Sequence, residues 1–178
     1  MNDRAQIANQ VFIYASAAIL FALVLLYGTS AVQNFMEKSE IIDMIELKNK
    51  LEAKVEEIAP TQDRMVFDFK VPSGHDSICF IDRSKGGETC DQPNTKCWDA
   101  CQNTPDLHPL VCDAWIDNTT QNVFLLEPVG STPIRTGPIQ LLNASGADVG
   151  YLCFDVQTSN LKLVFRGKGD RVQIQQAK

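Results

Sequence analysis

A charge-free apolar stretch at residues 7–27 is the feature that most constrains this chain. Between Val11 and Leu26 the only polar side chains are those of Tyr14 and Ser16. A helix of about 20 residues crosses a hydrocarbon core of roughly 30 Å. In lipid every backbone polar group must bond within its own segment, which favours a helix. The stretch therefore predicts a membrane-spanning helix; a buried core helix is the alternative.

The helical pattern continues from residue 32 to residue 58 without a proline. Apolar residues recur there at three- and four-residue steps, which is typical of a helix with one apolar face. This stripe consists of Ile41, Met44, Leu47, Leu51, Val55 and Ile58. The pair Ala59-Pro60 predicts the end of the helix, because the residue before a proline is disfavoured in helical conformation. The stripe fits packing against the chain's own carboxyl-terminal part or against neighbouring copies, and periodicity does not separate the two.

The apolar period changes to two from Met65 onward, which is typical of half-buried strands. We expect strands at residues 65–71, 77–82, 122–127, 139–143, 151–156, 161–166 and 171–175. The segment from Arg83 to Pro109 is polar and is expected to be irregular. The predicted fold class is α+β: a long transmembrane and amphipathic helix followed by an antiparallel, β-sandwich-like or rolled head. We expect residues 1–58 to form the anchoring and assembly helix and residues 59–178 the extracellular head.

Six cysteines lie between Cys79 and Cys153, an even number that favours an oxidising compartment and three disulfides. Both end members lie in apolar strand sequence, ICFID and LCFDV. We therefore predict a Cys79–Cys153 disulfide across the sheet.

The other four cysteines can be joined in three ways. A Cys97–Cys101 pair is the least favourable if the residues between them are helical, because residues four apart hold their Cβ atoms roughly 5–6 Å apart and a disulfide needs roughly 3.5–4.5 Å. We prefer Cys90–Cys101 together with Cys97–Cys112.

The spacing C-x3-C-x6-H-x3-C is the one metal-like pattern in the chain. Three thiolates and an imidazole, from Cys97, Cys101, His108 and Cys112, would suit tetrahedral zinc. Outside the membrane two disulfides are the better explanation of these cysteines. Neither His108 nor His75 has a nucleophile near it in sequence, and no phosphate-binding or protease motif occurs. We therefore expect no enzyme activity, no metal and no cofactor.

The formal charge of −6 lies after the apolar stretch, because Asp3 and Arg4 cancel. An acidic head disfavours binding to nucleic acid. The sequons at Asn118 and Asn143 are candidate glycosylation sites. Together with the cysteines these features predict a cell-membrane anchor with an extracellular head. A cleaved secretory signal ending near Ala31 is the alternative, opposed by the length of the apolar stretch and by the helical pattern that continues past it.

The segment RAQIANQVF, Arg4 to Phe12, resembles the archaeal prepilin signal, in which a basic and a small residue precede the cut and Gln-Ile often follows. With the two-part helix and β-rich head, the chain resembles a type IV pilin. The resemblance implies cleavage between Ala5 and Gln6. Gln10 stands where the family usually has a Glu that pairs with a neighbouring subunit's terminus.

These features predict a structural subunit of a cell-surface filament, with copies of itself and membrane lipid as partners. Small residues in the apolar stretch would let helices approach closely; the predicted assembly residues are Ala15, Ala18, Ala22 and Gly28. The alternatives are a monomeric signal-anchored β domain that binds a ligand or partner, and a Cys/His metal-binding surface protein.

Overall fold

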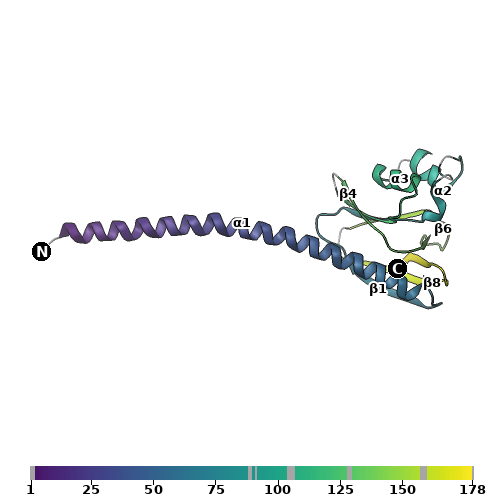
Figure 1. The fold of residues 1–178 in the computed structure, drawn as a ribbon, viewed down its shortest axis with the longest axis horizontal. Coiled ribbons are helices and arrows are strands. Elements are labelled where there is room, and N and C mark those ends of the chain that lie inside the picture. The colour runs from purple at the N-terminus through teal and green to yellow at the C-terminus, as the bar shows by residue number, and fades with distance from the viewer. Residues whose placement is uncertain are drawn as a thin grey trace. The chain divides into compact units, whose positions relative to one another are not determined.

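Figure 1 shows a computed structural model of the chain. The structure describes residues 3–87, 90, 92–103, 107–127, 130–156 and 160–177, and within these the side chains of 3–11, 33–38, 40, 102 and 103 are not described. The chain divides into two compact units, Met1–Ile42 and Asp43–Lys178, and each is described by itself. The division falls inside the first helix, whereas the expected boundary at residue 58 coincides with the end of that helix.

The first unit is helical. The helix α1 covers Asp3–Ile58 and contributes its residues up to Ile42 to this unit. Among the described residues one segment, Phe12–Val32, is long and apolar enough to cross a membrane, judged by length and composition. The helix ends at Ile58 as predicted, and the Ala59 N–H still donates to the Val55 carbonyl at 2.9 Å.

The second unit contains two sheets. The five-stranded sheet has the order β1 (Arg64–Lys70), β8 (Asn160–Gly167), β9 (Val172–Gln176), β5 (Ile139–Leu142) and β6 (Asp148–Val149). The four-stranded sheet has the order β4 (Gly130–Ile134), β3 (Val123–Glu127), β2 (Ser77–Ile81) and β7 (Tyr151–Asp155). Every neighbouring pair is antiparallel except β5 and β9, which run parallel. The fold class is therefore α+β with mainly antiparallel sheets, as expected.

One apolar cluster joins the end of α1 to both sheets. The four helix residues Leu47, Leu51, Val55 and Ile58 are each 1–2% exposed. Their buried neighbours come from the five-stranded sheet and the four-stranded sheet and include Phe69, Leu141, Leu163, Phe165, Ile174, Ile78, Phe80, Val123, Leu125 and Ile134. This part of the amphipathic stripe therefore packs against the chain's own head.

The amino-terminal part of the stripe behaves differently. Of the stripe residues before Leu47, Ile41 is 55% exposed, whereas Met44 is half-buried and packs against the cluster. Beside the stripe, Ile42 and Ile45 are 63% and 52% exposed.

Within the described residues, the two strands β4 and β6 and four short helices were not expected from the sequence. Strand β4 has the sequence GSTPI, which resembles a turn, but Pro133 is tolerated because β4 is an edge strand. Strand β6 has two residues and no detectable period. The helices fall in or just after the segment expected to be irregular: η1 (Arg83–Lys85), α2 (Lys96–Trp98), η3 (Asp99–Asn103) and α3 (Pro109–Ile116). Of these, α2 and α3 contact each other (Figure 1).

We predict that Leu51→Ala destabilises the head by about 2–5 kcal/mol, because a buried leucine is replaced by a cavity. The matched control is Ile45→Ala on the same helix, which is expected to change stability by less than about 0.5 kcal/mol because Ile45 is exposed. Chemical unfolding of the full chain in detergent measures both. Equal effects of the two substitutions would contradict the described packing.

Candidate functional site

Most of the exposed large apolar side chains of the described chain lie on α1 between Phe12 and Val32, and we name this the apolar helix surface. Bulky side chains are open to solvent along it: Phe12 is 71% exposed, Leu20 63% and Leu26 68%. Water exposure of so many large apolar groups is unfavourable, at about 25 cal/mol per Å². This surface therefore needs an apolar environment, either lipid or other helices.

Two hydroxyl groups on the apolar helix surface, those of Ser16 and Thr29, are already hydrogen-bonded within the helix. Ser16 Oγ donates to the Phe12 and Ile13 carbonyls at 2.9 and 3.0 Å. Thr29 Oγ1 donates to the Leu25 carbonyl at 2.9 Å. Such bonds to the preceding turn satisfy a hydroxyl that has no water near it. Neither hydroxyl therefore prevents the surface from being covered by an apolar partner.

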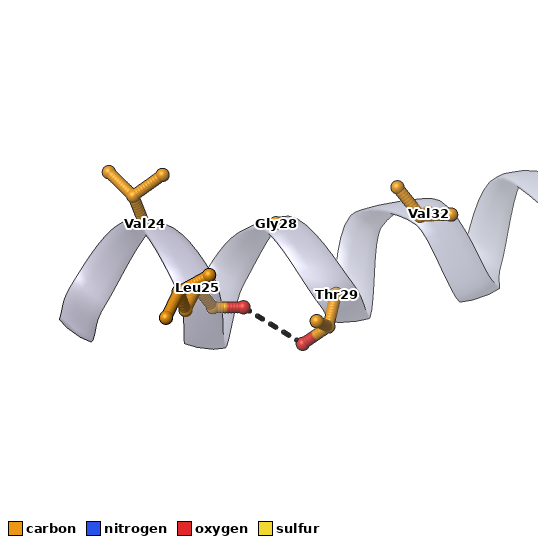
Figure 2. Close-up of a pocket in the computed structure, with 5 residues that line it drawn as sticks. All are labelled: Val24, Leu25, Gly28, Thr29 and Val32. Carbon is orange, nitrogen blue, oxygen red and sulfur yellow. Dashed lines mark hydrogen bonds between the residues drawn. The ribbon is translucent and has the colours of Figure 1, made fainter. Parts of the chain in front are cut away.

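A shallow notch interrupts this surface at Gly28. Figure 2 shows the notch, lined by Val24, Leu25, Gly28, Thr29 and Val32. A Cβ built on Gly28 would have no atom within 4 Å, so the glycine leaves open space. A neighbouring helix can approach its backbone here more closely than at a position with a large side chain.

The other predicted assembly residues are also exposed. Ala15, Ala18 and Ala22 all have open side chains. Steps of three and four residues place them on one side of the helix. For the predicted cleavage site, Ala5 and Gln6, the backbone is helical but the side chains lie outside the described part of the chain, as does that of Gln10.

The predicted disulfide between Cys79 and Cys153 is present. These residues are directly opposite each other on β2 and β7, with Cα atoms 4.1 Å apart. Reading both cysteines as strand residues was sufficient to find this pair.

The predicted pairing of the other four cysteines is wrong. The structure joins Cys90 to Cys97 and Cys101 to Cys112. Cys97 lies on α2 and Cys101 one turn later on η3, and they are not bonded to each other, as expected. Cys97 is bonded to Cys90 in the segment before this turn, and Cys101 is bonded to Cys112 on α3 after it. The sequence separations within these two disulfides are 7 and 11 residues.

These disulfides remove the thiolates of the alternative metal-ligand set. The sulfur atoms of Cys97, Cys101 and Cys112 are bonded to sulfur, so none is a thiolate. His108 is the N-cap of α3, where its Nδ1 accepts a hydrogen bond from the Leu110 N–H at 3.3 Å. No group of three His, Cys, Asp or Glu residues able to hold a metal occurs in the described ranges.

Trp115 joins the disulfide-bonded segment to the sheets. It is 0% exposed, and its Nε1 donates to the Asp82 carbonyl at 3.0 Å. Its ring meets Tyr151 edge to face at a centroid distance of 6.2 Å. A Cβ on Gly150 would lie 2.5 Å from the indole, so the close approach requires glycine. Trp115 is therefore a structural anchor.

The two sequon asparagines occupy different environments. Asn118 is exposed in a left-handed turn with φ 48°. Asn143 is half-buried, and its Oδ1 accepts from Ser145 N, Ser145 Oγ and Ala147 N at 3.0, 2.6 and 2.9 Å. These bonds use the oxygen and leave the amide nitrogen, the atom that a glycan would modify, without a described partner.

We predict that disulfide mapping of the non-reduced protein finds Cys90–Cys97 and Cys101–Cys112. Proteolysis followed by mass spectrometry identifies the linked peptides, and removal of one of these links should destabilise the head by about 2–4 kcal/mol. The peptide that joins Cys79 to Cys153 serves as the internal control. A Cys90–Cys101 peptide would contradict the described fold of this segment.

We predict that the ion pair between Asp148 and Lys85 makes a small, pH-dependent contribution to stability. Burial alone would raise the pKa of Asp148, but hydrogen bonds from Lys85 and Gln140 outweigh it and the pKa is lowered. Because the pKa of Asp148 is lower in the folded state than in the unfolded state, where it is about 3.9, the ionised carboxylate stabilises the fold above that pH. This stabilisation is lost as pH falls through the pKa of the folded state.

The corresponding variant is Asp148→Asn. Asp148 is 43% exposed, so the substitution is expected to lower the free energy of unfolding at pH 7 by at most about 1 kcal/mol. The difference from the parent protein should vanish well below pH 4, where both carry an uncharged side chain. Thermal unfolding across this pH range measures it, and a difference that grows toward low pH would contradict the assigned pair.

Comparison with known proteins gives no match: no family model, curated protein or solved structure matches this chain. The functional argument therefore depends on the two features described above, the apolar helix surface and the disulfide-bonded head.

Proposed function

We propose that the chain is the structural subunit of a cell-surface, pilus-like filament, assembled through its amino-terminal helix. The head, with its two sheets arranged as a sandwich, would be extracellular, in keeping with three disulfides. Before assembly the apolar helix surface would hold the subunit in the membrane.

The observation that carries this proposal is the exposed apolar surface beyond the membrane-length segment. The segment Phe12–Val32 has 21 residues, and about 20 residues already cross a bilayer core. Ile41, Ile42 and Ile45 lie past its end and are more than half exposed. A lipid core that ends near Val32 does not cover them, whereas a neighbouring helix does.

The small residues on the apolar helix surface support packing of helix on helix. Between apolar helices in an apolar environment, association depends on close van der Waals contact, which small side chains permit. Ala15, Ala18 and Ala22 share one side of the helix, and Gly28 adds the notch of Figure 2. A purely lipid-facing helix has no such requirement.

A monomeric, membrane-anchored binding domain is the competing function. It needs the segment Phe12–Val32 but gives no role to exposed Ile41, Ile42 and Ile45. The metal-binding alternative loses its thiolate ligands to the disulfides. Cleavage at Ala5–Gln6 and glycosylation at Asn118 and Asn143 belong to the filament proposal and are tested by mass analysis of the mature protein.

We predict that Ala18→Trp abolishes assembly while the head still folds, because the bulky side chain prevents close approach of helices. The matched control is Ala18→Ser, which keeps the small size and is expected to assemble. Electron microscopy of cell surfaces, with sizing of the full chain in mild detergent, measures assembly, and disulfide mapping verifies the head.

The competing function makes the opposite prediction. If the parent protein stays monomeric at high concentration in mild detergent, and if cells show no filaments, the filament proposal is wrong. The monomeric binding domain then becomes the better-supported function.

A further inference from the structure

An open hollow of about 220 Å³ lies on the five-stranded sheet of the second unit. Strands β1, β8, β9 and β5 contribute to it. Its lining residues are Arg64, Leu142, Val164, Arg166, Gln173 and Gln175. No aspartate or glutamate is among these described lining residues, and none of them belongs to the apolar helix surface.

The hollow lies on the outer face of this sheet, which is opposite the apolar core. Successive side chains of a strand point to opposite faces. On β8, Phe165 is 0% exposed and belongs to the core cluster, so the next residue, Arg166, lies on the outer face. On β9, Ile174 is 1% exposed in the same cluster, and Gln173 and Gln175 on either side of it lie on the outer face.

The strand register aligns two rows of side chains across this outer face. In one row Arg64 is directly opposite Arg166, and Arg166 is directly opposite Gln173. Gln140 on β5 continues this row beyond Gln173. The neighbouring row consists of Val66, Val164, Gln175 and Leu142. The hollow therefore combines two guanidinium groups, two amides and a strip of apolar surface.

The two arginines, Arg64 and Arg166, are named the arginine pair. Directly opposite residues hold their Cβ atoms roughly 4.5–5.5 Å apart, and like charges there destabilise a sheet. Among the described residues neither arginine forms an ion pair, and Asp68 on the same face is bound to Lys162 at 3.7 Å. Both arginines are exposed, and the charged end of a long exposed side chain stays in water. A solute can therefore reach both guanidinium groups, and an anion between them would relieve their repulsion.

The two glutamines of the lining are held in place from one side. Gln173 Nε2 donates to Gln140 Oε1 at 2.9 Å, and Gln175 Nε2 donates to the Asn143 carbonyl at 2.9 Å. These bonds fix the amide groups. Within the part of the chain that the structure describes, the Oε1 atoms of Gln173 and Gln175 accept no hydrogen bond, so they remain acceptors for hydroxyl donors.

We infer that this hollow binds a sugar that carries a tetrahedral oxyanion ester, a sulfate or a phosphate. Such an ester has several acceptor oxygens and can bridge the arginine pair, whereas a planar carboxylate is matched by one guanidinium. The sugar hydroxyl groups would donate to Gln173 and Gln175, and the C–H face of the ring would lie on Val164 and Leu142. The net charge of −6 disfavours a long polyanion, so the ligand is a short sugar with one ester group. The inference is independent of filament assembly.

The test titrates the full chain in detergent, at constant ionic strength, with glucose 6-sulfate and with glucose 6-phosphate. Nitrogen-15 spectra follow the backbone amides of Arg166 and Gln173. We expect saturable shifts at these residues, and the ester that binds more tightly identifies the oxyanion. Glucose, sodium sulfate, sodium phosphate and glucuronate are each expected to bind at least about tenfold more weakly, since each lacks part of the contact.

Each of these four probes can overturn the inference. Equal affinity for glucose would remove the role of the arginine pair. Equal affinity for inorganic sulfate or phosphate would leave an adventitious ion only, and equal affinity for glucuronate would exclude selection of a tetrahedral group. Shifts that stay linear in both esters would mean that the hollow is not a sugar site.

Two variants assign the site. Arg166→Gln and Arg64→Gln should each weaken binding by roughly ten- to a hundredfold, as expected for loss of hydrogen bonds to a charged group. Neither should lower the melting temperature, because each removes one of two repelling charges. The matched control is Arg135→Gln, which removes the same charge from an exposed residue after β4 and should bind like the parent protein. Binding that survives in Arg64→Gln on the edge strand β1, or that falls equally in Arg135→Gln, would overturn the assignment.

Discussion

The burial of four side chains at the end of α1 is the contact on which the second unit depends. Leu47, Leu51, Val55 and Ile58 contribute to the cluster that receives residues from both sheets. Fully burying one such side chain is worth about 1.5–3 kcal/mol. Without the helix the apolar faces of both sheets would lose their shared neighbour. The end of the helix is therefore part of the head, which explains why the compact unit begins at Asp43 and not after Ile58.

The same contact explains why the rest of the helix is left open. Apolar residues recur at equal steps before and after Leu47, so the sequence pattern is uniform across a physical boundary. What changes along the stripe is the presence of sheet residues: Ile41 is 55% exposed, Met44 is half-buried and Leu47 is 2% exposed. Periodicity identifies a face but not the surface that covers it. That is why the sequence left two partners possible for the stripe, and why the exposed part supports the filament proposal.

Structural elements marked by a strong local sequence pattern were predictable, and elements without such a pattern were not. Pro60 predicts the end of α1 at Ile58, and short apolar runs predict the strands around Cys79 and Cys153. Strand β4 was missed because its glycine, serine and proline favour turns, and only edge pairing makes it a strand. The pairing of the remaining cysteines depends on the path of short helices without an apolar period, so sequence could bound the choices without selecting one.

The disulfide-bonded segment and the loop after β2 are connected through Trp115. The disulfide at Cys112 fixes α3, and Trp115 on α3 donates to the Asp82 carbonyl. Asp82 in turn accepts hydrogen bonds from Ser84, so the start of this loop is held to the four-stranded sheet. Small heads lack a large core, and disulfides limit the motion of their loops. The segment expected to be irregular therefore stabilises the loop after β2 as well as itself.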